Sequence, residues 1–159
     1  MRRPLYALVL ALVVGIAGCG GDDSSDSADS PPAPAKAADF PKADGKTVAQ
    51  LRKEASGAGP VLAPTQSQLT PGKIRYGFAL FDRDRTQIAD VPVALYVAPA
   101  GGEAKGPVPA KWESLKVQAQ FQSRSTADDP DAAKAIYAAQ LDFPKPGRYE
   151  VLAIARLDG

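Results

Sequence analysis

Few residues in this chain are able to do chemistry, and their types exclude most kinds of active site. The 159-residue sequence contains no histidine, and Cys19 is its only cysteine. Ser-His-Asp and Cys-His catalysis and imidazole metal sites are therefore excluded, as are disulfides, CxxC redox motifs and zinc fingers within the chain. We expect a non-catalytic protein without a cofactor. The remaining candidates are clustered carboxylates and the single thiol.

The densest acidic cluster is Asp128, Asp129 and Asp131, which could offer hard oxygen ligands to calcium. The same residues fit a helix start, with Asp129 as N-cap and Pro130 in the first helical position. Asp131 would then lie in the first turn, where the helix dipole favours a carboxylate. The helix start explains the proline as well as the acids, so we favour it. The three aspartates stay weak candidates for a metal site.

Two further features are ambiguous. Asp82-Arg-Asp-Arg85 contains two carboxylates, but the interleaved arginines supply positive charge, so a polar hairpin turn is favoured over calcium. Trp112, next to Lys111, could mark a recognition surface. A tryptophan at the start of a strand more often packs into the core or over it, and we expect packing here.

Cys19 stands at the end of a secretion signal. Met1-Arg-Arg is positively charged, and Leu5 to Val14 is an unbroken apolar run too short to span a bilayer comfortably. Ile16-Ala-Gly-Cys19 follows and resembles the bacterial lipobox, whose cysteine receives diacylglycerol before cleavage. The resemblance implies lipidation of Cys19 and a chain anchored to a membrane. The alternative is a secretory signal that happens to contain a cysteine.

Composition divides the chain into four parts. Residues 1–18 would be the lipoprotein signal peptide. Residues 19–39, rich in Asp, Ser, Pro and Ala, would be a disordered acylated tether. Residues 40–59 would be a short helix and linker, and residues 60–159 an immunoglobulin-like β-sandwich domain. Lys and Arg (19) nearly balance Asp and Glu (18), so nothing in the charge predicts nucleic-acid binding.

The short helix has a recognisable start. Thr47 and Gln50 have the spacing of a capping box, and Val48, Leu51 and Ala55 then fall on one face. Two turns would not persist alone in water. The helix is therefore either docked on the main domain or loosely held.

From Pro60 the apolar period changes to two, and short strands separated by Pro/Gly turns predict an all-β, antiparallel sandwich. Leu115–Phe121 shows the cleanest alternation, and residues 99–109 are expected to form a flexible loop. Three strands are expected at Val61–Gln68, Leu115–Phe121 and Tyr149–Leu157. Three more are expected from their inward-facing residues. The first has Ile74, Tyr76, Phe78 and Leu80, the second has Val91, Val93, Leu95 and Val97, and the third has Tyr137, Leu141 and Phe143.

Tyr149 follows a turn made by Pro144, Pro146 and Gly147, at the start of a strand. This arrangement looks like the tyrosine corner of immunoglobulin-like sandwiches. We expect a structural role for Tyr149, Pro146 and Gly147. The ring would be largely buried, and the hydroxyl would bond the backbone near the turn.

The strand Tyr149–Leu157 is apolar on both faces, which is typical of a central strand. Asp158-Gly159 is a strong hairpin signal with no residue after it in this sequence. We therefore expect the sandwich to lack its last strand, as in a truncated reading frame. The alternative is that Val61–Gln68 pairs beside Tyr149–Leu157 instead.

Three blocks carry a family resemblance: Lys73–Arg83, Val93–Ala98 and Asp142–Tyr149. They resemble the N-terminal, immunoglobulin-like region of certain actinobacterial lipoproteins that continue into a thioredoxin-fold domain. The resemblance implies an accessory, non-catalytic module between a membrane and a partner domain. The redox cysteine pair of a thioredoxin domain has no counterpart in this sequence.

Together these features predict a membrane-anchored, extracytoplasmic lipoprotein with a non-catalytic binding or spacer domain. Its expected partners are the membrane, through the lipid, and a protein partner or a downstream thioredoxin-fold domain. One alternative is an N-terminal fragment or paralogue of a thioredoxin-family redox lipoprotein whose catalytic domain is absent from this chain. A weaker one is a calcium-dependent adhesion sandwich that uses Asp128, Asp129 and Asp131.

Overall fold

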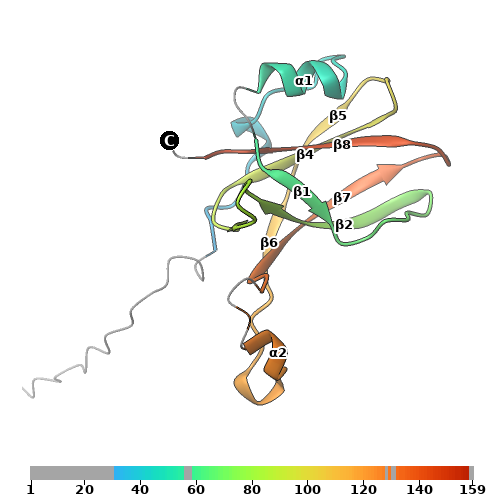
Figure 1. Ribbon diagram of the computed structural model, residues 1–159. Coiled ribbons are helices and arrows are strands. Elements are labelled where there is room, and N and C mark those ends of the chain that lie inside the picture. Colours follow the sequence, from blue (N-terminus) through green and yellow to red (C-terminus); the bar gives the residue numbers. More distant parts are fainter. Residues whose placement is uncertain (1–30, 56–58, 128, 130–131, 158–159) are drawn as a thin grey trace, which may run out of the picture.

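The computed structural model describes residues 31–55, 59–127, 129 and 132–157. Within these residues strands are the main regular structure, and the short helical segments lie outside the two sheets (Figure 1). The elements are η2 (Ala37–Asp39), α1 (Val48–Glu54), β1 (Val61–Pro64), β2 (Gly72–Phe81), β3 (Gln87–Ile88), β4 (Val93–Pro99), β5 (Lys105–Pro109), β6 (Lys111–Ser114), η3 (Ala119–Phe121), α2 (Arg124–Ala127), β7 (Ala135–Phe143) and β8 (Tyr149–Ala155).

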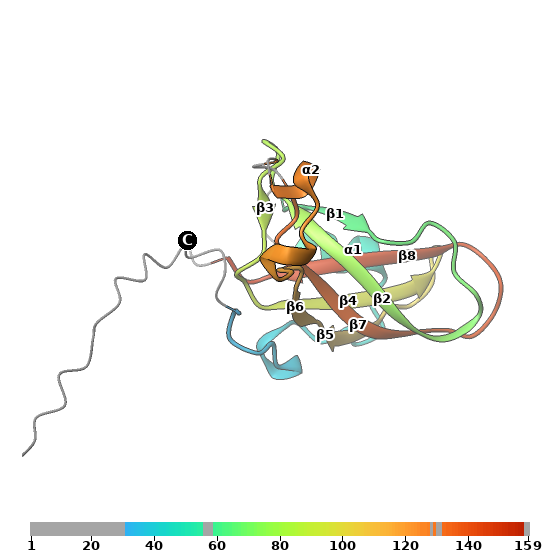
Figure 2. The same ribbon diagram turned by 90° about the horizontal axis from the view of Figure 1, so that it is seen from below.

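The strands form two antiparallel sheets that pack face to face (Figures 1 and 2). One sheet has the order β1-β2-β7-β6, with the short β3 also paired to β2. The other has the order β5-β4-β8. The expected all-β sandwich is therefore confirmed.

The strand order is that of an immunoglobulin-like domain, in which strands A-B-E-D form one sheet and C, F and G the other. Here β1-β2-β7-β6 takes the places of A-B-E-D, while β5-β4-β8 takes the places of C′-C-F. Among the described residues no strand occupies the place of G beside β8. β8 is an edge strand rather than a central one, and β1 pairs with β2, so the alternative pairing of Val61–Gln68 beside β8 is wrong.

The core lies between the two sheets, where alternate residues of each strand point inward. Phe78 of β2 is fully buried and stacks on Tyr137 of β7, with ring centroids 5.5 Å apart. The buried residues of this cluster are Tyr76, Phe78, Leu80, Val93, Leu95, Val97, Ala110, Tyr137, Ala139, Leu141 and Phe143. The inward-facing residues expected for β2, β4 and β7 are among them, except for Ile74 and Val91, which are half-buried.

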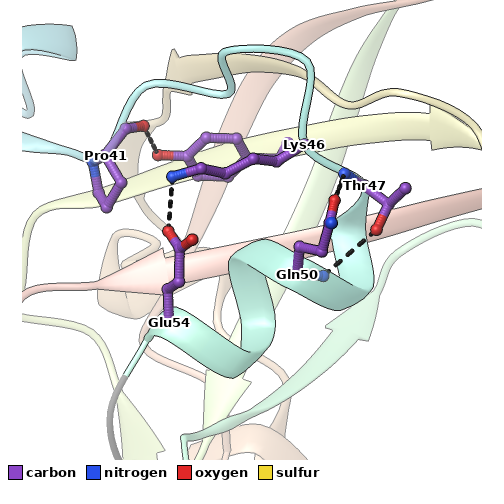
Figure 3. A network of polar contacts seen from close by, with 6 residues as sticks. Pro41, Lys46, Thr47, Gln50 and Glu54 are labelled. Carbon is purple, nitrogen blue, oxygen red and sulfur yellow. Dashed lines mark hydrogen bonds and ion pairs between the residues drawn. The ribbon is translucent and has the colours of Figure 1, made fainter.

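Helix α1 covers the outer face of the smaller sheet and begins with the expected capping box (Figure 3). The backbone N–H of Gln50 donates to Thr47 Oγ1, and the N–H of Thr47 donates to Gln50 Oε1. Val48 and Leu51 are buried against Tyr96 of β4 and its neighbours. The helix is therefore docked on the domain, because its two apolar residues share a cluster with the sheet.

Two polar contacts, one to β4 and one to α1, hold the segment that precedes α1 against the domain (Figure 3). The Tyr96 hydroxyl donates to the carbonyl of Pro41, and Lys46 Nζ lies 2.7 Å from a carboxylate oxygen of Glu54. η2 lies against β5 (Figure 2). The stretch 40–55 consequently packs as part of the sandwich domain.

Two expectations about strands are wrong. Leu115–Phe121 is not a strand: its apolar residues Leu115, Val117 and Phe121 are 43%, 51% and 73% exposed. β6 ends at Ser114 because its partner β7 begins at Ala135, so the following residues have no strand to pair with. Residues 105–109, expected in a loop, form β5 instead, which pairs with β4. β5 lies at the sheet edge, where a proline needs no ladder partner for its missing N–H.

Candidate functional site

The residue on which the lipoprotein hypothesis depends, Cys19, lies outside the described residues, as do Asp128, Pro130 and Asp131. Asp129 is described and exposed, and its carbonyl accepts the N–H of Ala132 at 3.2 Å. Residues 132–134 are not helical, so the described part of this segment does not continue into the expected turn of helix. Within the described ranges no three acidic, histidine or cysteine side chains gather as a metal site would require.

Asp82 stabilises a turn, as expected. Its Oδ1 accepts the backbone N–H groups of Asp84 at 2.9 Å and Thr86 at 2.8 Å, while its own N–H donates to Thr86 O. Arg85 adopts a left-handed conformation with φ 69°, which completes the reversal into β3. This carboxylate oxygen already has two donors from its own loop, so the polar turn explains the presence of Asp82.

Trp112 lies half-buried on β6 and lines a groove of about 320 Å³. Across the groove runs the proline-rich segment 31–35, the first part of the chain that the structure describes. The indole N–H of Trp112 is buried and has no acceptor among the described residues. The tryptophan therefore packs beneath the end of the tether, in agreement with the packing interpretation.

Beside this groove, Tyr137 makes a pair of long-range hydrogen bonds that sequence reasoning missed. Its hydroxyl donates to Val91 O at 2.9 Å and accepts the N–H of Val91 at 3.3 Å. The side chain is 2% exposed, and this burial raises the pKa of Tyr137 to about 12. Burial likewise raises the pKa of Tyr96 to about 12. Both phenols are structural groups that hold distant segments together.

Tyr149 makes the hydrogen bonds that were expected of it. Its hydroxyl donates to Lys145 O at 2.9 Å and accepts the N–H of Lys145 at 3.3 Å, across the turn that contains Pro146 and Gly147. Its ring contacts Phe143 edge-on, with centroids 5.0 Å apart. Tyr149 lies on β8, which pairs with β4. Tyr149 packs against the core cluster but is not fully buried.

A second cavity of about 320 Å³ lies between this edge and the larger sheet. Tyr149 and Val151 of β8 form one side, and Tyr76 and Phe143 form part of the other. The loop between β1 and β2 contributes Leu69 and Pro71 to the lining, and Pro64 at the end of β1 lies beside them. The lining is mostly apolar, with Gln66, Ser67 and Lys145 as its polar members beside the tyrosines.

The outer face of the larger sheet carries a small cluster of charges. Glu113 lies 3.0 Å from Lys111 Nζ and 3.2 Å from a guanidinium nitrogen of Arg75. The hydrogen bond from Lys111, together with the charge of both cations, lowers the pKa of Glu113. The cluster is open to solvent and stays a surface ion-pair network, which is worth little to stability.

No protein-family model, curated protein or solved structure that was compared with the chain matches it. Among the described residues, no helix combines the length and the hydropathy needed to cross a bilayer.

Proposed function

We propose that this chain is an extracytoplasmic lipoprotein, held at a bacterial membrane by lipid on Cys19, whose sandwich is a non-catalytic binding or spacer domain. The observation that carries the proposal is the order of residues at the N-terminus. A positively charged start, an apolar run from Leu5 to Val14 and small residues precede a single cysteine. The absence of any other cysteine supports it, because an unpaired exported thiol would be reactive.

The attachment of the tether to the sandwich supports a spacer role. From Cys19 to Pro31 the covalent chain can reach at most about 40 Å. The segment 31–35 then borders the Trp112 groove, and the following residues pack against β5 and under α1. A lipid on Cys19 would therefore hold the domain close to the membrane.

The polar groups with defined partners support a non-catalytic role. Asp82 holds a turn, Glu113 forms surface ion pairs, and Tyr96, Tyr137 and Tyr149 tie segments of backbone together. The three blocks that resemble the actinobacterial lipoproteins form β2, most of β4 and the β7–β8 turn. These blocks supply packing and turns rather than a site, as in an accessory module beside another domain.

Metabolic labelling tests the anchor. Bacteria that express the full chain receive a clickable fatty acid, and the Cys19→Ala variant serves as the matched control. We expect label on the wild type, in the membrane fraction, and background labelling of the variant. Equal labelling of both proteins would refute the lipid anchor.

A further inference from the structure

The edge of the smaller sheet along β8 is unpaired and apolar. β8 pairs with β4 on one side, and no described strand pairs with the other. Its residues Val151 to Ala155 are all aliphatic and all partly exposed. An open apolar edge is a template for another strand, which natural domains cover or pair.

Alternate residues of β8 direct their backbone groups toward this open edge. The N–H of Arg156 donates to Pro92 O, and Arg148 O accepts the N–H of Ala100, so even-numbered residues face β4. In an antiparallel ladder the N–H and C=O of one residue point to the same side, and consecutive residues alternate. The N–H and C=O groups of Tyr149, Val151, Ala153 and Ala155 therefore point outward.

The sequence of β8 is complementary to itself in one antiparallel register. With Ala153 of one copy opposite Ala153 of another, the outward-pointing residues would form the hydrogen-bonded pairs. Glu150 of each copy would then lie opposite Arg156 of the other, in the closer, non-hydrogen-bonded type of pair. A slip of two residues would instead place Glu150 opposite Ile154.

We propose that β8 is a dimerisation edge, at which β8 of a second copy pairs antiparallel in the place of strand G. The two-fold axis passes through the Ala153 pair, and one sheet of six strands runs through both copies. Glu150 and Arg156 set the register. Both residues are solvent-exposed: Glu150 accepts the N–H of Gly101 at 3.2 Å, and Arg156 lies 4.0 Å from Asp39.

The cavity beside β8 supports the proposal that β8 of a second copy pairs at this edge. In the immunoglobulin-like order, strand G lies over strand A, which is β1 here. Leu62 of β1 and Leu69 after it pack against the core but are only partly buried. A strand added to β8 would lie over this region and cover the cavity that Tyr149 and Val151 line.

Sedimentation equilibrium of the chain from Gly20 onward, which keeps every described residue, tests the proposal. We expect a monomer–dimer equilibrium at concentrations up to about 1 mM. The amides of Val151, Ala153 and Ala155 should gain hydrogen-exchange protection as the concentration rises. A monomer throughout this range, or an edge whose amides stay unprotected in the dimer, would overturn the proposal.

Charge reversal tests the register. Glu150→Arg and Arg156→Glu each replace two attractive cross-strand pairs by two repulsive ones, so each should weaken the dimer about tenfold. The double variant restores opposite charges and should recover most of the affinity. Arg124→Glu, in α2, is the control for a charge change outside β8 and should have no effect. Loss of affinity in both single variants without recovery in the double variant would contradict the register.

Discussion

Two tyrosines make the same pair of hydrogen bonds in different surroundings, so removal of their hydroxyls isolates the effect of burial. Tyr137 bonds both the C=O and the N–H of Val91, at 2.9 and 3.3 Å, and Tyr149 bonds both groups of Lys145 at the same two distances. Tyr137 is 2% exposed, whereas the groups around Tyr149 are open to water.

The expected loss of unfolding free energy depends on whether water can bind the backbone groups that each hydroxyl leaves behind. A hydrogen bond contributes about 1 kcal/mol net, and a buried polar group left without a partner costs about 1–3 kcal/mol. Water can satisfy Lys145 fully but the half-buried Val91 only in part. We therefore expect Tyr137→Phe to lower the free energy of unfolding by about 2 kcal/mol and Tyr149→Phe by less than about 1 kcal/mol.

Urea unfolding, followed through the fluorescence of the single tryptophan, measures both variants. The m-values should stay equal to that of the wild type, so that the shift in midpoint reports stability alone. If Tyr149→Phe costs as much as Tyr137→Phe, the argument that burial decides the difference is wrong.

Three further outcomes follow from the structure. Leu51→Ala, at 1% exposure between α1 and the smaller sheet, should lower the free energy of unfolding by about 2–4 kcal/mol in the same urea assay, and a neutral result would show that α1 is not docked. Gly106→Ala should cost about 3 kcal/mol or more, because a Cβ there would lie 2.7 Å from Leu95 O at a φ of 145°; a fully stable variant would contradict this local structure. Tyr96 and Tyr137 hold their protons more tightly in the folded state, with the pKa raised from 10.0 to about 12, so the stability present below pH 10 should be lost as the pH rises to 12. Absorbance titration at alkaline pH checks this, and titration of both phenols near pH 10 in the folded protein would contradict it.

Local signals in the sequence predicted local structure well. The capping box at Thr47 and Gln50 depends on residues three apart, and the inward faces of β2 and β7 follow from strict alternation. The Tyr149 hydrogen bond was also predictable, since donor and acceptor lie four residues apart. In each case the deciding contacts are close in the chain.

Features that depend on distant segments were not predictable in the same way. Leu115–Phe121 alternates cleanly, but a strand also needs a partner, and β7 begins too late to provide one. The bond between Tyr137 and Val91 joins residues 46 positions apart, and no local pattern marks it. β5 was missed because its prolines resemble a loop, although at a sheet edge they cost no ladder bond.

The central claim is that the mature protein begins at a lipidated Cys19. Intact-mass spectrometry of the protein extracted from bacterial membranes tests it most directly. We predict a protein that begins at Cys19 and is heavier than the unmodified chain by diacylglycerol, with or without a further acyl chain, and release of the protein into the soluble fraction when Cys19→Ala is expressed. A mature protein that begins at another residue, or that carries no lipid on Cys19, would contradict the account.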